Sequence, residues 1–134
     1  MSFDLSLEFI LSGKPKRVMQ LLTDAALIRK WSGEDAVFEN KVGGKVELFD
    51  GWVKGEVIKT GEAELVHTWK AANWAEEVKP SEVHYILKAD KGGTKVVINH
   101  TGFPDEKERD SHKAGWTDFF FDPIEDFILI IDKS

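Results

Sequence analysis

Hydrophobic and polar residues alternate over the first eleven positions of the chain. Phe3, Leu5, Leu7, Phe9 and Leu11 recur with a period of two. Successive side chains of a strand point to opposite faces of a sheet. The pattern therefore predicts a strand with one buried face.

The stretch RVMQLLTDAALIRKW, residues 17–31, changes to helical spacing, with apolar residues every three or four positions. Pro15 suits the first turn of a helix, where its missing N–H costs nothing. Thr23 or Asp24 can cap a second helix. We therefore predict two short helices with a break between them.

From position 35 onward, turns divide short runs of apolar and β-branched residues. The turns contain Gly43-Gly44, Asp50-Gly51 and Gly92-Gly93. Asp-Gly favours a two-residue type I′ hairpin turn, because both positions need positive φ. Strands are expected near 35–40, 45–50, 52–60, 63–71, 81–90 and 94–101. Together with the first strand they predict a seven-stranded, meander-like sheet.

A helix is expected to follow the last strand. Asp105 as N-cap, with Glu108 three residues later, forms a capping box. Asp122 and Glu125 form a second such box around Pro123, which lacks the N–H that an unbroken helix would use. We therefore predict a kink or restart near Asp122.

One face of this C-terminal helix is apolar and rich in aromatic rings. Spacings of mainly three and four residues predict one stripe: Trp116, Phe120, Ile124, Phe127, Ile128 and Ile131. Neighbouring apolar residues widen the stripe, so this end of the helix is expected to be covered on most sides: Phe119, Phe121, Leu129 and Ile130. Five acidic residues exclude a membrane span, which needs about 20 nearly uncharged residues. The rings are therefore expected to bury against protein.

Composition narrows the class of protein. A chain of 134 residues with 42% hydrophobic residues predicts one globular domain, 1–134. The net charge of −6 disfavours a nucleic-acid partner. The absence of cysteine excludes disulfides and thiol nucleophiles and fits a reducing compartment. Because the N-terminus also lacks the basic region of a signal peptide, we expect a cytoplasmic protein.

Six stretches of the chain, in a characteristic order, carry a resemblance to a known family. They are VMQLLTDAALIRKWSG, VGGKVELFDGWVKGEV, LVHTWK, SEVHYIL, GGTKVVINHTGFP and HKAGWTDFFFDPIEDF. These stretches resemble the activators of the ATPase of ninety-kilodalton heat-shock chaperones, within the superfamily of START domains and the birch pollen allergen. LFDGWVKGEV and GWTDFFFDPIEDF are especially similar to the C-terminal domain of the eukaryotic two-domain co-chaperone.

The resemblance implies an α+β helix-grip fold. In this fold a curved, seven-stranded antiparallel sheet wraps around a long C-terminal helix, with two short helices after the first strand. Relatives often hold an elongated apolar cavity between the sheet and the helix.

We expect that cavity to be the binding site. Its predicted lining is Trp69, Val96, Ile98, His100, Trp116, Phe120 and Ile124. His100 follows Val96 and Ile98 at period two, so it should project from the same face. It could serve as an acid or base, or be hydrogen-bonded at the sheet end beside Thr101, and we favour the second role. The sequence leaves open whether the cavity is lined or filled by Phe119, Phe120 and Phe121.

The positions of the remaining histidines and of two tryptophans in the sequence suggest a role for each. His67 is a second candidate for the wet end of the cavity, and His112 is expected on a solvated helix face. Neither of them, nor His84, shows the spacing of a metal site. Trp52 and Trp74 lie in turn or loop segments and are candidates for a pocket rim or a protein contact.

These residues predict a binding protein that uses no cofactor or metal. The leading hypothesis is non-enzymatic binding of a small apolar molecule, without membrane insertion. The resemblance gives the alternative, a co-chaperone-like domain with a heat-shock chaperone as partner. A cyclase or hydrolase of the superfamily is a third hypothesis, although the chain has no GxSxG motif and no serine with an obvious paired base.

Overall fold

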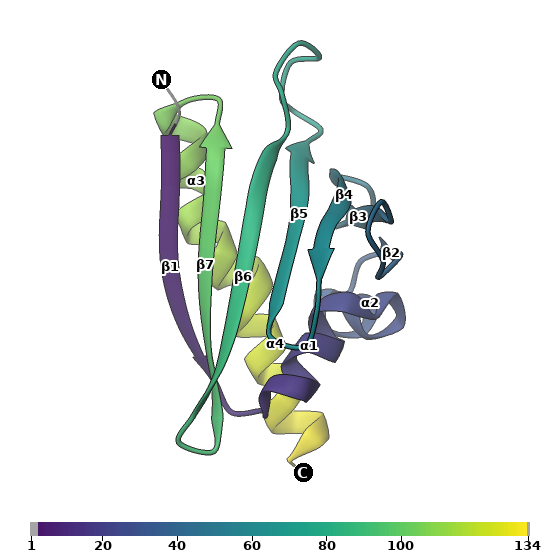
Figure 1. Cartoon of the computed structure of the whole chain (residues 1–134), viewed down its shortest axis with the longest axis vertical. Helices are drawn as coiled ribbons and strands as arrows, with labels where there is room; N and C mark the ends of the chain where they lie inside the picture. The colour runs from purple at the N-terminus through teal and green to yellow at the C-terminus, as the bar shows by residue number, and fades with distance from the viewer. Residues whose placement is uncertain (1–2, 134) are drawn as a thin grey trace.

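The computed structural model describes residues 3–133, which form a seven-stranded antiparallel sheet, a pair of short helices and a long C-terminal helix (Figure 1). The strands are β1 (Phe3–Leu11), β2 (Val37–Phe38), β3 (Lys45–Leu48), β4 (Val53–Thr60), β5 (Glu64–Ala71), β6 (Ser81–Asp90) and β7 (Gly93–Phe103). The helices are α1 (Pro15–Thr23), α2 (Ala25–Ser32), α3 (Glu106–Gly115) and α4 (Asp122–Phe127), with π-helical turns at Trp116–Phe121 and Ile128–Asp132.

The strand order in the sheet is β1-β7-β6-β5-β4-β3-β2. Strands β2 to β7 form the predicted meander, and β1 returns to pair with β7, with Phe9 opposite Val96. The expected strand at 35–40 shortens to Val37–Phe38, paired with β3. Residues of β1 alternate between exposed and more buried positions, as the sequence pattern predicts.

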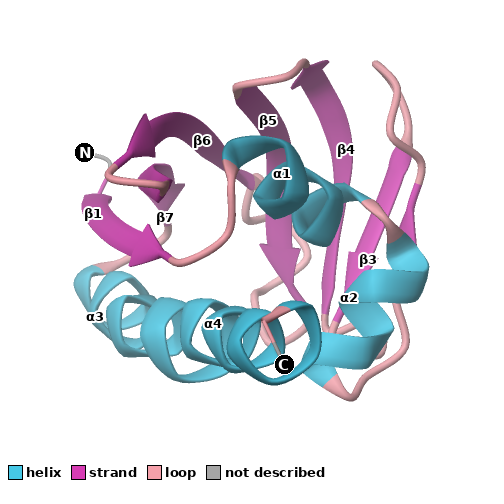
Figure 2. Ribbon diagram, turned by 90° about the horizontal axis from the view of Figure 1, so that it is seen from below, coloured by secondary structure: helices cyan, strands magenta, loops and turns pink. Residues whose placement is uncertain are grey.

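The sheet curves around the C-terminal helix (Figure 2). The helix runs diagonally across one face of the sheet, and α1 and α2 lie near the β4 and β3 side. Buried apolar residues from the sheet, α1, α2 and the C-terminal helix form a common core. A sheet and a helix that each bury one face must pack together, so the helix-grip architecture is confirmed.

The two short helices are also confirmed. The Asp24 carboxylate accepts hydrogen bonds from the N–H groups of Ala26 (2.9 Å) and Leu27 (3.4 Å), so it caps α2 at the predicted break. The indole of Trp31 donates to the carbonyl oxygen of Leu21 at 2.8 Å. This bond joins the end of α2 to α1.

The predicted kink or restart near Asp122 takes the form of a change in hydrogen-bond register: α4 begins at Asp122, while the backbone stays helical through Pro123. Asp122 keeps helical angles, φ −64° and ψ −46°, and its N–H donates to the carbonyl of Thr117, five residues earlier. This π-helical turn accommodates a residue that has no N–H to donate. The helix therefore changes its hydrogen-bond register rather than its continuity.

The two capping boxes are realised only in part. Asp105 accepts a hydrogen bond from the N–H of Glu108 at 2.8 Å, as predicted. The Glu108 carboxylate, however, binds the indole N–H of Trp74. Glu125 likewise binds at long range, accepting from the N–H (2.9 Å) and hydroxyl (2.6 Å) of Ser12. Both glutamates thus hold the helix to other parts of the fold.

The apolar stripe of the helix is narrower than expected. Its fully buried members are Trp116, Phe120, Phe121, Ile124 and Ile128. Four apolar residues of the same helix are exposed: Phe119, Leu129, Ile130 and Ile131. The helix forms an outer layer, so only one side of it can meet the sheet, and the prediction of cover on most sides is wrong. Within residues 3–133, no helix is long and apolar enough to cross a membrane.

Candidate functional site

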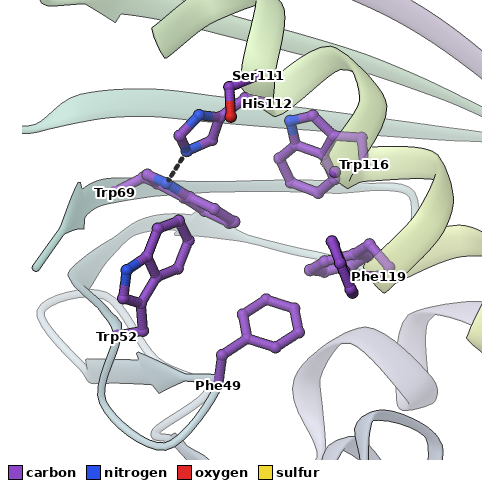
Figure 3. Close-up of a pocket in the computed structure, with 9 residues that line it drawn as sticks. Phe49, Trp52, Trp69, Ser111, His112, Trp116 and Phe119 are labelled. Atoms are coloured by element: carbon purple, nitrogen blue, oxygen red, sulfur yellow. Dashed lines mark hydrogen bonds between the residues drawn. The ribbon is translucent and has the colours of Figure 1, made fainter. Parts of the chain in front are cut away.

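An open pocket lies between the turn that joins β3 to β4 and the C-terminal helix (Figure 3). Its volume is about 290 Å³. The lining consists of Phe49, Trp52, Trp69, Ser111, His112, Gly115, Trp116, Phe119 and Phe120. We call this the aromatic pocket, because six of these nine residues are phenylalanine or tryptophan. Concave, mostly apolar surfaces with few polar groups are the usual sites of ligand binding.

The β3–β4 turn forms one wall of the aromatic pocket. Asp50 and Gly51 have positive φ (58° and 82°), as their sequence predicts, and the Trp52 N–H donates to the Phe49 carbonyl at 3.1 Å. Phe49 itself also has positive φ, 55°, which is uncommon for a bulky residue and was not predicted. Its ring lies 6.2 Å from that of Phe120 on the helix. A strained backbone thus accompanies the approach of the turn to the helix.

The π-helical turn forms the opposite wall. Trp116 and Phe120 point inward, with ring centroids 4.6 Å apart, and both are buried. Phe119 lies between them in the sequence but is 68% exposed at the pocket mouth. The extra residue in a π-helical turn shifts the directions of the side chains around it. One ring therefore stays at the surface beside two that enter the core.

Trp69 and His112 form the inner end of the aromatic pocket. The indole N–H of Trp69 donates to Nε2 of His112 at 3.2 Å, and Nδ1 of His112 donates to the Glu108 carbonyl at 2.8 Å. His112 is therefore neutral, and its burial lowers its pKa. The expected solvated position of His112 is wrong, since the residue is 7% exposed and Trp52 stacks on it at 5.9 Å.

His100 lies behind this pocket in a hydrogen-bonded chain. Its Nδ1 accepts from the indole N–H of Trp116 at 3.2 Å, and its Nε2 donates to the Ser81 hydroxyl at 2.7 Å. That hydroxyl in turn donates to the Trp69 carbonyl at 2.8 Å. His100 is fully buried, and desolvation, with smaller contributions from His112 and His67, lowers its pKa to about 2. The predicted hydrogen-bonded role is therefore observed, with Ser81 and Trp116 as partners rather than Thr101.

His67 is buried in the same way. Its Nδ1 donates to the Thr68 carbonyl and its Nε2 accepts from the Tyr85 hydroxyl, both at 2.8 Å. Burial lowers its pKa to about 4. Both nitrogens of each buried histidine are thus occupied, and neither His67 nor His100 is among the residues that line the aromatic pocket.

The structure separates the predicted lining into two groups. Trp69, Trp116 and Phe120 line the aromatic pocket. Four others lie in the sealed core, with no exposed surface: Val96, Ile98, His100 and Ile124. The ring of Phe121 packs on Phe120 at 5.1 Å and on Phe9 of β1 at 4.3 Å, so rings fill the space between helix and sheet. The pocket instead opens at the edge of that interface.

The two tryptophans assigned to a rim or contact have different positions. Trp52 is 41% exposed and lines the aromatic pocket, whereas Trp74 is buried against Glu108. Phe49, Ser111 and Gly115 were not predicted as lining residues. The Asp-Gly turn next to Phe49 was a usable signal, because a turn of known type places the residues that flank it side by side. No sequence signal marked Ser111 or Gly115.

A second hollow, of about 770 Å³, lies between α1, the β4–β5 turn and β6. Its wall mixes apolar side chains with polar ones such as Gln20, Asn40 and Glu62. It contains no aromatic ring. Of the two hollows, only the aromatic pocket has a lining made mostly of aromatic rings.

The polar side chains behind the aromatic pocket are hydrogen-bonded to other protein groups. Every buried polar side-chain atom in the described part of the chain has a hydrogen-bond partner. Across residues 3–133, no group of three histidines or acidic residues is arranged to hold a metal ion. A general acid or base must reach the proton that it transfers, and the nitrogens of the buried histidines face other protein groups.

Comparison with known proteins identifies the family. The family model described as "Activator of Hsp90 ATPase homolog 1-like protein" matches residues 12–128. The chain belongs to this family. It is 35% identical over 101 residues to "Activator of 90 kDa heat shock protein ATPase homolog" of Dictyostelium discoideum. This match covers 72% of the chain but only 25% of that protein, so the chain spans about a quarter of the length of this relative.

Solved structures support the same assignment. An HSP90 activator from Plasmodium falciparum is 30% identical to the chain, with a TM-score of 0.77, and the match covers 93% of the chain and 94% of that chain. The structure of Ara h 8.0201 is 14% identical, with a TM-score of 0.78, over 96% of the chain and 99% of that chain. The second similarity concerns the fold alone. Members of the Hsp90-activator family and this more distant protein thus share the helix-grip fold of the chain.

Proposed function

We propose that the chain stimulates the ATPase of a heat-shock chaperone of the ninety-kilodalton class, in the cytoplasm and without catalysing a reaction itself. The observation that carries this proposal is the match to the Plasmodium falciparum HSP90 activator, which spans nearly the full length of both chains at 30% identity.

The mouth of the aromatic pocket is the surface that we assign to the chaperone contact. Trp52 and Phe119 are large apolar residues that stay 41% and 68% exposed on opposite walls. Aromatic residues are enriched in the centres of protein interfaces, where a few of them contribute most of the binding energy. Two such rings beside a concave surface suit an apolar segment of a partner.

The test measures ATP hydrolysis by purified chaperone with and without the chain. We expect the chain to raise the rate of hydrolysis. For the double variant Trp52→Ala, Phe119→Ala, the concentration of chain that gives half of the maximal rate should rise about tenfold or more. The reason is that aromatic residues at the centre of an interface can each contribute over about 1 kcal/mol of binding energy. The matched control is Ile10→Ala, another exposed apolar residue, on β1 away from the pocket. An unchanged rate with the wild-type chain would refute the activation. If the double variant and the control lose the same amount of ATPase stimulation, the assigned surface is refuted.

A second function, binding of a small apolar molecule, is favoured by the aromatic pocket itself. About 290 Å³ is near the lower end of the volumes typical of ligand pockets. Burial of apolar surface stabilises a complex by about 25 cal/mol per Å², so a ligand that fills this wall of rings gains from contact area alone. A binding pocket and a chaperone contact at its mouth are compatible with each other.

Heteronuclear chemical-shift mapping with a panel of flavonoids, sterols and fatty acids tests this second function. We expect a bound ligand to shift the signals of Trp52, Trp69 and Trp116, and Gly115→Leu to abolish those shifts. Gly115 lines the pocket, and a Cβ added there would meet no atom within 4 Å, so we expect the backbone to accept leucine and its side chain to take up pocket volume. Shifts that persist in Gly115→Leu would place binding elsewhere.

A further inference from the structure

We propose that the aromatic pocket selects a neutral molecule of one or two rings that carries a single hydrogen-bonding group, and that the Ser111 hydroxyl is the partner of that group. The inference rests on the second function proposed above and adds to it the chemical class of the ligand and the residue that determines specificity.

The lining of the aromatic pocket offers no charged side chain to an ionised ligand. None of its nine residues is aspartate, glutamate, lysine or arginine. His112, the one titratable lining residue, is held neutral because it accepts the Trp69 N–H on Nε2. A carboxylate that loses its water in such a wall finds no opposite charge, and burying an unpaired ion is strongly unfavourable. An ammonium finds only the faces of the rings, and phenyltrimethylammonium is the probe for that contact.

The indole N–H groups of the pocket either donate to other protein groups or point away from the pocket. The indole N–H groups of Trp69 and Trp116 donate to His112 and His100, both at 3.2 Å. Figure 3 shows the indole nitrogen of Trp52 pointing away from the enclosed space. A ligand therefore gains no hydrogen bond from these three side chains.

Ser111 is the exception in this lining. Its hydroxyl lies beside His112 at the top of the pocket in Figure 3, and within residues 3–133 it has no hydrogen-bond partner. A hydroxyl can both donate and accept, so it suits a phenol, an amide or a ketone equally. Ser111 is therefore the one lining side chain to which we expect a ligand to form a hydrogen bond.

The size and walls of the pocket favour rings. An apolar cavity of about 150 Å³ is known to hold benzene, and the aromatic pocket is about twice that volume. Aromatic pairs prefer offset or edge-to-face contacts, which walls of phenylalanine and tryptophan offer from several directions. Gly115, one turn after Ser111, leaves the space beside that hydroxyl open. One ring, or two fused rings, therefore fits next to the anchor.

Three probes of equal ring size test the proposal by calorimetric titration at pH 7: 2-naphthol, naphthalene and 2-naphthoate. We expect 2-naphthol to bind more tightly than naphthalene, and 2-naphthoate to bind most weakly. Ser111→Ala should weaken 2-naphthol about three- to tenfold, the effect of one neutral hydrogen bond, and leave naphthalene unchanged. Alanine favours the helix more than serine does, so this variant should fold.

Two controls separate this inference from the function on which it rests. Ser6→Ala removes a hydroxyl on β1 that binds Asn99, far from the pocket, and should change no affinity. Equal binding of naphthalene and 2-naphthol to the wild-type chain, with no binding of either to Gly115→Leu, would show that the pocket binds ligands and would refute the role of Ser111. Tighter binding of 2-naphthoate or of phenyltrimethylammonium would refute the neutral class. Failure of all probes to bind would refute both proposals.

Discussion

Lowering the pH from 7.5 to 4.5 is expected to reduce the free energy of unfolding by about 5 kcal/mol, a large part of the 5–15 kcal/mol typical of a domain. The reason is that His67 and His100 are buried as neutral imidazoles, with pKa values lowered to about 4 and about 2. Burial also lowers the pKa of His112. In the unfolded chain all three titrate near about 6.5.

The direction of this effect follows from proton counting. Below about pH 6.5 the unfolded chain binds more protons on these imidazoles than the folded chain does, so stability is fully present above that pH and falls as the pH decreases. For each of His67 and His100 the loss between pH 6.5 and 4.5 is between about 2 and 3 kcal/mol, at about 1.4 kcal/mol per pH unit. Carboxyl groups titrate near about 4 when unfolded and contribute little in this window.

Urea unfolding at several pH values measures this dependence. The variant His100→Gln should lower the slope of stability against pH by about 1.4 kcal/mol per pH unit, because one titrating group is removed. Ile10→Ala provides the control, because it truncates an exposed side chain that carries no titrating group and should therefore leave the slope unchanged. Equal stability at pH 7.5 and 4.5 would show that the buried histidines are not neutral as described.

Much of the fold could be predicted because it depends on local patterns. Alternation in β1, the Asp-Gly turn and the Asp24 cap each report the conformation of a few neighbouring residues, and each was confirmed. The resemblance of six stretches to one family supplied the remaining step, the arrangement of sheet and helix. Both sources agree because a half-apolar sheet and a half-apolar helix have few ways to bury both faces.

The errors concern residues whose partners lie far away in the sequence. Glu108 was assigned to a local capping box and His112 to a solvated helix face, but Trp74 and Trp69 approach from the sheet and its loops and bind them. Glu125 was assigned to a local cap and instead binds Ser12. A side chain can satisfy its hydrogen bonds locally or at long range, and the local pattern does not distinguish the two.

The aromatic pocket was only partly predictable for a related reason. Periodicity identified Trp69, Trp116 and Phe120 as inward-pointing, which holds for both a cavity wall and a filled core. The π-helical turn then decides which rings of the 119–121 run enter the core. Because its register follows from Pro123 and from packing on the sheet, a plain period of 3.6 residues places Phe119 wrongly.

Trp116→Ala is expected to destabilise the folded chain by about 3–5 kcal/mol, the usual cost of truncating a buried large aromatic residue. The Trp116 ring is buried and lies 5.0 Å from Trp69 and 4.6 Å from Phe120. Its loss would also leave Nδ1 of His100 without a donor, which adds to the cost. Phe119→Ala, three residues later, should change stability by about 0.5 kcal/mol or less, because that ring is mostly exposed.

The central claim is that the C-terminal helix packs one aromatic face against its own sheet and leaves Phe119 at the mouth of the aromatic pocket. The direct test is urea unfolding of Trp116→Ala and Phe119→Ala beside the wild-type chain at pH 7.5. We expect the unfolding free energies of the two variants to differ by about 2.5 kcal/mol or more. Equal losses, or a larger loss in Phe119→Ala, would contradict it.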